Sequence, residues 1–522
     1  MSNILVLDCT LRDGGYVNNW DFGRENIVSI IDKLSQSNID MIECGFISQT
    51  KKTDEDKSIF VSVDDMEKCL PKDKSCVYAA MINYGEYNIN DLPDYAGGPL
   101  KTLRIAFHQE EMKDAVEYCK QIKQKGYSVF VQPMVTLNYS KEEILWLVKE
   151  ANSFLPQALY IVDSFGTMNK TQLLSIYSLI EKNLEQDIAI GFHSHNNMQL
   201  SFSNAQELMD IKSEHQIIID SSVYGMGRGA GNLCTELITK YVNDNYGGNY
   251  DLIPILEIID EQLMPVFLKT PWGYSVPFYV ASINNCHPNY ASFLLERQTL
   301  SVKDIHKILR LITDEKRVNY DKNYIRKLYE NYQSKHIDDA DTVAKLKKLF
   351  SGRKVVVIAP GRSIVEEKNK LINFCSENSP MIISVNFECE FVKPDFVFVG
   401  NQKRFRQIKK TDNNIILTSN IESDLENKIV VDYTDLLNEN EYISDNSGMM
   451  ILNLLKKCDV KDVYLAGFDG FSENVSDNYY REKLISGSTK SDLINISNAI
   501  QEKIRSLKDC MNIEFLTSSI YD

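Results

Sequence analysis

The sequence predicts an α/β protein in which a (β/α)8 TIM barrel is followed by a helical extension and a second, smaller Rossmann-like α/β domain. Three observations carry this prediction. Short apolar runs rich in β-branched residues alternate with stretches of helical periodicity, which is the pattern of parallel βαβ units. The chain has 522 residues, more than one ordinary core accommodates. Polar residues gather at the carboxyl ends of the first strands, where closed barrels carry their sites.

Eight strands are expected in the amino-terminal part, each followed by enough chain for a helix. This number fits a closed barrel better than an open doubly wound sheet, and we place the barrel at residues 1–290. The expected strands are Ile4–Asp8, Asp40–Cys44, Cys76–Ile82, Thr102–Phe107, Ser128–Gln132, Leu159–Asp163, Ile188–His193 and Ile217–Ser221.

A helical, charged stretch separates the barrel from a second α/β series. Residues 291–350 are expected to form a helical extension and linker, with helices at Lys303–Ile312, Tyr324–Tyr332 and Thr342–Phe350. Residues 351–522 are expected to form the Rossmann-like domain. Its expected strands are Val355–Ile358, Ile382–Asn386, Phe396–Gly400, Ile415–Thr418, Ile429–Asp432, Val463–Gly467 and Ile513–Leu516.

Composition and charge narrow the class of protein. The balance of 57 basic and 73 acidic residues gives a net charge of −16, the wrong sign for a broad nucleic-acid-binding face. The 11 cysteines are scattered and form no CxxC pair, as is typical of reduced thiols. The amino terminus does not resemble a signal peptide, and no apolar segment is long enough to span a membrane. We therefore expect a cytoplasmic homo-oligomer without nucleic-acid or membrane partners.

Polar residues after the first, seventh and eighth expected strands predict a metal site. His193 and His195 are two positions apart on an extended chain, so both imidazoles project to the same side and one ion can bind both. In a closed barrel the first strand lies only two places away, so Asp13 can complete a mixed ligand set. Asn232, in the glycine-rich loop after the eighth strand, can supply a carbonyl oxygen as a fourth ligand.

Each of these pieces has a structural alternative. An Arg12-Asp13 pair after a strand is often a capping or surface pair, a His-x-His pair is structural about as often as metal-binding, and the Gly225–Asn232 stretch can be a tight turn. Their joint occurrence at the ends of three strands favours the metal site.

The motifs also carry a family resemblance. Thr10–Gly14, Gly191–Asn197 and Val223–Asn232 with Thr235-Glu236 resemble the DRE-TIM metallolyase superfamily, the HMG-CoA-lyase-like group, over roughly residues 1–290. Within it the barrel is most similar to 4-hydroxy-2-oxovalerate aldolases. The resemblance implies a Mn²⁺ or Mg²⁺ ion bound by Asp13, His193, His195 and Asn232, with Arg12 stabilising an enolate.

Such a site predicts a lyase or aldolase that uses the enolate of a 2-oxo acid such as pyruvate together with an aldehyde. The chain departs from the aldolases at one point: they carry Asn-His after Asp-Gly, the histidine being the base, and this chain has Gly15-Tyr16. Tyr16 either acts as the base with a lowered pKa or only shapes the pocket. Alternatives are a Claisen-type acyltransferase that uses an acyl-CoA and a 2-oxo acid, and a non-catalytic ligand-binding barrel that scaffolds the second domain.

Other polar residues at strand ends carry less weight. Glu43, Gln132 and Asp163 end expected strands, and Arg104 lies on one, where it is either salt-bridged or faces a ligand carboxylate. His108 and His287 show no partner pattern, although His287 can line the mouth of the barrel.

In the second domain, residues 355–364 form a strand, a glycine-containing turn and a helix. This geometry can aim backbone N–H groups at an anion, so Gly361, Arg362 and Ser363 are candidate cofactor-binding residues; the alternative is an ordinary βα turn. The domain faintly resembles nucleotide-sugar-handling Rossmann-like domains, which implies a nucleotide or a phosphorylated sugar as its ligand.

Overall fold

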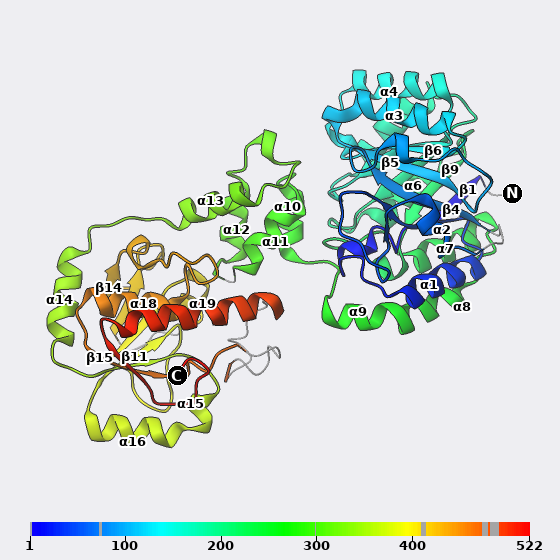
Figure 1. Ribbon diagram of the computed structural model, residues 1–522. Coiled ribbons are helices and arrows are strands. Elements are labelled where there is room, and N and C mark those ends of the chain that lie inside the picture. Colours follow the sequence, from blue (N-terminus) through cyan, green and yellow to red (C-terminus); the bar gives the residue numbers. More distant parts are fainter. Residues whose placement is uncertain (1–2, 72–75, 298, 409–413, 472–478, 481–489) are drawn as a thin grey trace. The chain divides into compact units, whose positions relative to one another are not determined.

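The computed structural model describes residues 3–71, 76–297, 299–408, 414–471, 479–480 and 490–522. The chain divides into two compact units (Figure 1). The first unit comprises Met1–Asn289 and Thr313–Tyr320, and the second comprises Tyr290–Ile312 and Asp321–Asp522.

The first unit is a closed barrel of parallel strands. Its sheet has the order β1-β9-β8-β7-β6-β5-β4-β2, and the pairing of β1 with β2 closes the ring, which confirms the predicted (β/α)8 fold. A short additional strand, β3, pairs with β2. The strands are β1 Ile4–Asp8, β2 Met41–Ile47, β3 Ile59–Phe60, β4 Val77–Asn83, β5 Leu100–Phe107, β6 Ser128–Pro133, β7 Ala158–Asp163, β8 Ala189–Ser194 and β9 Ile217–Ser221.

Alternate side chains of each strand enter the barrel, because successive residues of a strand point to opposite faces. On β8 this period places Ala189, Gly191 and His193 on the inner side. A Cβ atom at Gly191 would lie 2.2 Å from the ring of Tyr160, so glycine makes room for that ring. The barrel interior contains an apolar cluster of Leu7, Cys9, Met41, Phe130, Ala158, Tyr160, Val162, Ala189 and Ile218.

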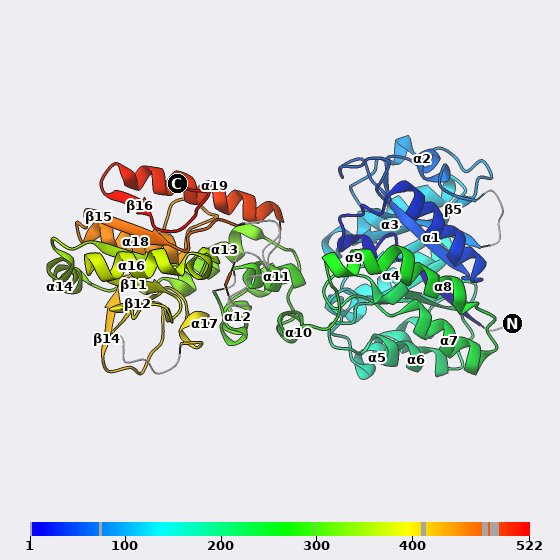
Figure 2. The same cartoon turned by 90° about the horizontal axis from the view of Figure 1, so that it is seen from below.

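Helices surround the barrel, and their apolar faces pack on the outer side of the strands. Figure 2 shows α1, α8 and α7, which contact one another in that order, on the outside of the barrel. The helices are α1 Arg24–Gln36, α2 Val63–Glu67, α3 Met112–Gln124, α4 Lys141–Phe154, α5 Lys170–Glu181, α6 Ser201–Asp210, α7 Thr235–Tyr246, α8 Leu252–Ile258, α9 Met264–Lys269 and α10 Val276–Ile283. Within the described residues, no helix of the chain is both long and apolar enough to cross a membrane.

The second unit contains a seven-stranded parallel sheet with the order β14-β13-β12-β11-β10-β15-β16. All seven predicted strands are present: β10 Val355–Ile358, β11 Met381–Val385, β12 Phe396–Val399, β13 Asn414–Thr418, β14 Lys428–Val431, β15 Asp462–Ala466 and β16 Asn512–Phe515. The chain builds β10 to β14 in one direction and then returns to place β15 on the other side of β10.

Helices cover both faces of this sheet. Residues of α14, α18 and α19 pack on one face, and residues of α15 and α16 pack on the other. Because Leu346 and Phe350 of α14 belong to this core, the end of the expected linker is part of the second unit. The helices are α11 Pro288–Glu296, α12 Val302–Leu309, α13 Lys322–Gln333, α14 Ala340–Phe350, α15 Ser363–Glu366, α16 Lys368–Asn378, α17 Gln402–Phe405, α18 Ser447–Lys457 and α19 Lys490–Lys508.

Candidate metal centre

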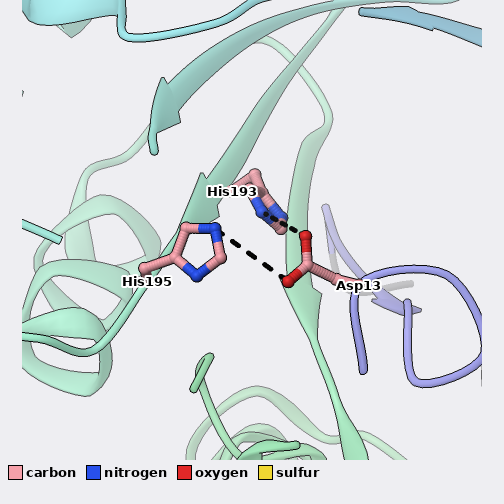
Figure 3. A group of neighbouring side chains, drawn as sticks. All are labelled: Asp13, His193 and His195. Carbon is pink, nitrogen blue, oxygen red and sulfur yellow. Dashed lines mark ion pairs between the residues drawn. The ribbon is translucent and has the colours of Figure 1, made fainter. Parts of the chain in front are cut away.

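Three of the predicted ligands meet at the carboxyl end of the barrel. Asp13 lies in the turn after β1, His193 is on β8 and His195 follows that strand. Oδ2 of Asp13 lies 3.5 Å from Nε2 of His193, and Oδ1 lies 3.9 Å from Nε2 of His195. Figure 3 shows the carboxylate facing both imidazoles. One ligand atom from each residue lies within 4.8 Å of the others, and all three side chains are buried, so the group can hold one ion.

The loop after β9 brings the fourth predicted ligand to the same place. Asn232 forms an isolated antiparallel bridge with His195, and its amide nitrogen donates to Oδ1 of Asp13 at 3.0 Å. Its Oδ1 is buried and, among the described residues, has no hydrogen-bond partner. Gly231 permits this approach, because it has a φ of +81° and a Cβ there would lie 1.9 Å from the carbonyl oxygen of Gly225. The unpaired oxygen of Asn232 is therefore a candidate acceptor for a cation.

A buried carboxylate orients His193. Nδ1 of His193 lies 3.0 Å from Oδ2 of Asp220 on β9, so in the neutral ring a proton on Nδ1 is donated to Asp220 and Nε2 is left facing Asp13. Asp220 also accepts from the hydroxyl of Tyr160 at 3.0 Å and forms an ion pair with Arg104. This carboxylate-histidine arrangement is the usual support of a metal-binding imidazole.

The electrostatics of the site favour an ionised Asp13 and a neutral His195, whereas contacts with Asp13 and Asp220 raise the pKa of His193 despite its burial. Burial opposes ionisation of Asp13, but Arg12 and the two histidines hold its pKa well below the ordinary value. Desolvation lowers the pKa of His195 to about 3, so this ring is neutral at physiological pH. Neutral imidazole and carboxylate are the protonation states in which these side chains bind metals.

Arg12 lies beside the ligands and is held by two carboxylates. Its Nε donates to Oε2 of Glu43 at 2.7 Å, and Nη1 forms an ion pair with Asp13. In the described part of the chain, Nη2 of Arg12 has no protein partner. Arg104 lies behind this pair, fully buried between Glu43 and Asp220, so its role is the salt-bridged one and it does not reach the cavity.

A cavity of about 220 Å³ opens above the candidate ligands. Arg12, Asp13, His193 and His195 form one wall, and Tyr16, His108, Arg228 and His287 are among the other lining residues. Gln132 also lines it, whereas the Asp163 carboxylate accepts from the N–H groups of Thr167 and Met168 and holds the turn after β7.

Two side chains of the cavity have shifted pKa values. Tyr16 keeps 37% of its accessible surface, yet desolvation raises the pKa of its phenol above the ordinary value, opposed in part by Arg228, whose guanidinium lies 5.0 Å from the ring centre. Desolvation and Arg228 hold the pKa of His287 well below its ordinary value. Nδ1 of His287 accepts from the N–H of Asn289 at 3.1 Å, and its Nε2 lies 3.3 Å from Nη1 of Arg228, so both ring nitrogens face N–H donors.

Sequence reasoning did not find Asp220 as the partner of His193, nor Arg228 as a cavity residue. An aspartate inside the apolar run Ile217–Ser221 is a signal for the first, since a buried carboxylate requires a partner. The sequence shows no partner pattern for His108 or His287, and the structure has both lining the cavity.

In the second unit, the predicted turn at Gly361, Arg362 and Ser363 is filled by the chain itself. The N–H of Ser363 donates to Oδ2 of Asp469 at 2.8 Å, and its hydroxyl also donates to this carboxylate. A Cβ at Gly361 would lie 2.3 Å from the carbonyl oxygen of Gly467. An anion at this turn would have to displace Asp469.

Comparison with known proteins agrees with the geometry of the first unit. Residues 101–258 match the HMGL-like family model. The chain is 26% identical over 267 residues to a 4-hydroxy-2-oxovalerate aldolase of Pseudoalteromonas translucida, which covers 50% of this chain and 76% of the relative. It is 23% identical over 279 residues to an oxaloacetate decarboxylase of Mycobacterium tuberculosis, covering 52% and 79%. The carboxyl transferase domain of Rhizobium etli pyruvate carboxylase, with a TM-score of 0.50, 12% identity and coverages of 66% and 65%, shares the fold.

Proposed function

We propose that the first unit, an HMGL-like domain, is a divalent-metal-dependent lyase that cleaves or forms a C–C bond through the enolate of a 2-oxo acid such as pyruvate. The observation that carries the proposal is the meeting of Asp13, His193 and His195 beside Arg12 in one cavity. The aldolase and the decarboxylase among the relatives support the same class of reaction. A 4-hydroxy-2-oxo acid, which yields pyruvate and an aldehyde, is the substrate class that we propose.

The residues fit a divalent ion. Two imidazoles, one carboxylate and the open amide oxygen of Asn232 form a mixed nitrogen and oxygen donor set that suits Mn²⁺ or Mg²⁺. When bound, such an ion supplies Lewis-acid polarisation of the keto group of the 2-oxo acid. Asp220 positions His193 for this role, since a carboxylate on Nδ1 fixes the tautomer of the ring.

Arg12 stabilises the negative charge that develops on the substrate oxygen. Glu43 and Asp13 hold its guanidinium in one orientation, so little reorganisation is needed when charge appears. Of the five N–H donors of an arginine, those on Nη2 remain for a substrate oxygen or carboxylate.

The proton transfers are assigned to Tyr16 and His108. Because burial raises the pKa of Tyr16, its phenol stays protonated at neutral pH and donates a hydrogen bond or a proton, which argues against a base role. The imidazole of His108, at the end of β5 in the same cavity, is the group that we assign to accept the alcohol proton of the substrate.

The proposed barrel chemistry requires neither the nucleotide nor the phosphorylated sugar that the sequence predicts as ligands of the second unit. The Claisen-type alternative predicts release of free CoA thiol from acetyl-CoA and a 2-oxo acid, and we expect none. The non-catalytic alternative predicts a barrel that binds a ligand without proton exchange.

The test is hydrogen exchange of pyruvate in D₂O, followed by NMR of the methyl protons. The full chain is loaded with Mn²⁺ in one sample and with Mg²⁺ in another. We expect metal-dependent exchange that is lost in His193→Ala and kept in His306→Ala, a histidine of the second unit. Mn²⁺ titration by electron paramagnetic resonance gives a second readout, in which only His193→Ala loses binding. Unchanged exchange in His193→Ala, or none in the parent protein with either ion, would contradict the proposal.

A further inference from the structure

The sheet of the second unit has a topological switch point between β10 and β15. The chain adds β11 to β14 one after another on one side of β10, and it then places β15 and β16 on the other side. Open parallel sheets bind ligands outside the carboxyl ends of the strands at such a point. Two cavities of about 340 and 150 Å³ lie beside the loops that follow β10, β11, β12 and β15. They share Asn386, Arg404, Asn446, Ser447, Phe471 and Tyr479, and we call the combined space the switch-point cleft.

Nearly buried polar side chains in this cleft have unused hydrogen-bonding capacity. Ser447 is 6% exposed and Asn401 is 7% exposed. Asn401 uses its amide oxygen to accept from the N–H of Arg404 at 2.9 Å. Among the described residues, neither its amide nitrogen nor the hydroxyl of Ser447 has a hydrogen-bond partner. Because neither atom is among the fully enclosed unpaired atoms of the described residues, both are open to hydrogen bonds with a ligand in the cleft.

The cleft also offers a place for an anion. Helix α18 begins at Ser447 and has 11 residues, with Asn446 accepting from the N–H of Met449 at 3.1 Å as its cap. The first N–H groups of a helix have no helical acceptor and carry positive partial charge. Gly400 lets the loop after β12 come close to this helix start, because a Cβ there would lie 2.4 Å from the hydroxyl oxygen of Ser447.

Arg404 of α17 lines both cavities beside the start of α18. Burial lowers the pKa of Arg404 below its ordinary value, which shows that its charge is partly desolvated. Nη1 of Arg404 donates to Oε1 of Gln407 at 3.0 Å, which holds the guanidinium in place. An anion beside Arg404 and the first turn of α18 would be attracted by the charge of the guanidinium and by the N–H groups of the helix.

The rest of the cleft suits a ring with hydroxyl groups. Phe468 and Phe471 line the smaller cavity, and Phe293 and Tyr442 line the larger one, so flat apolar faces are present in both. The carboxylate of Asp445 lines the larger cavity and can accept from ligand hydroxyls. An inorganic anion alone would leave these surfaces unused.

We propose that the switch-point cleft binds a nucleoside phosphate, with the phosphate at the first turn of α18 beside Arg404 and the nucleoside against the aromatic side chains. The filled turn at Gly361 to Ser363 is not the phosphate site, because Asp469 occupies its donors. The proposal does not rest on the activity of the barrel.

The test is isothermal titration calorimetry of the full chain in EDTA with AMP, GMP, CMP and UMP, the four parent nucleosides and inorganic phosphate. At least one nucleotide is expected to bind about 10-fold or more tightly than its nucleoside and than phosphate, since only the nucleotide uses both parts of the cleft. Arg404→Gln should weaken this binding by about 10- to 100-fold, the loss of a charge-assisted hydrogen bond. Arg406→Gln, an exposed arginine just after α17, is the matched control and should change it by less than about two-fold.

Absence of binding by all four nucleotides, or equal affinities in Arg404→Gln and Arg406→Gln, would overturn the proposal. Equal affinity for phosphate and for the best nucleotide would overturn its nucleoside part. If Arg404→Gln does not fold by circular dichroism, Ser447→Ala, which removes one hydroxyl, takes its place with an expected loss of several-fold. His193→Ala should keep nucleotide binding while losing Mn²⁺, so that failure of the barrel proposal and failure of this one are distinguishable.

Discussion

Replacing Asp220 with asparagine tests whether the buried carboxylate supports the metal centre. Asp220 accepts from Nδ1 of His193 and from the hydroxyl of Tyr160, both at 3.0 Å, and it pairs with Arg104. Asp220→Asn keeps the shape of the side chain but removes its charge. The variant therefore weakens the support of His193 and leaves Arg104 with Glu43 as its remaining carboxylate.

Two magnitudes follow from this geometry. Loss of the carboxylate behind a metal-binding histidine typically lowers metal affinity by about 10- to 100-fold. Removing one partner of a buried ion pair lowers the free energy of unfolding by about 3–5 kcal/mol. Because Arg104 keeps its ion pair with Glu43, we expect a loss at the lower end, about 3 kcal/mol. For a unit of about 300 residues, such a loss lowers the melting temperature by roughly 5 °C.

The assay is a Mn²⁺ titration of the folded variant, with its thermal melting measured in parallel in EDTA. Asp94→Asn is the matched control, because the Asp94 side chain is 86% exposed in the same unit and should leave both quantities unchanged. A folded Asp220→Asn protein that binds Mn²⁺ within about two-fold of the parent affinity would refute the orienting role that the hydrogen bond to His193 implies.

Three further outcomes are expected at the same site. Asn232→Ala should lower Mn²⁺ affinity by about 10-fold or more, whereas Asn232→Asp keeps an oxygen there and should retain binding; equal affinities would remove Asn232 from the ligand set. Tyr16→Phe and His108→Gln should each slow cleavage of a 4-hydroxy-2-oxo acid by on the order of 10²-fold or more without changing Mn²⁺ affinity, and an unchanged kcat for Tyr16→Phe would mean that this ring only shapes the pocket. The folded-state pKa of Asp220 is lowered by Arg104 and His193 despite burial, so its stabilising contribution is present above a pH of about 4 and is lost as the pH falls through the lowered value. In EDTA the melting temperature of the parent protein should therefore fall more steeply than that of Asp220→Asn as the pH is lowered below about 5. Parallel curves would show that Asp220 is not the source of this pH dependence.

Patterns that repeat over a few residues made much of the fold predictable. Short apolar runs rich in β-branched residues located the strands of both sheets, because parallel strands buried on both faces are apolar along their whole length. The period of two residues along a strand predicted that His193 and His195 share one side. The ends of strands in a closed barrel must converge, so Asp13 could be assigned to these histidines before any contact was known.

Contacts between distant segments required the tertiary structure. His193 and Asp220 are 27 residues apart, and Arg104 and Asp220 are 116 apart, so no local pattern pairs them. A charged residue on an inner strand position is equally consistent with a salt bridge and with a ligand contact, and only the closed barrel decided that Arg104 is salt-bridged. The protonated state of Tyr16 likewise depends on desolvation by neighbours from other segments.

The glycine turn of the second unit shows the same division. Local apolar and glycine signals predicted a strand, a turn and a helix at residues 355–364, and the structure has β10 and the start of α15 there. Whether the donors of that turn are open was decided by Asp469, which is 106 residues away and accepts from Ser363. Neighbouring residues determine the local backbone geometry. Whether a backbone N–H group is free to bind a ligand depends on which distant side chain the folded sheet brings beside it.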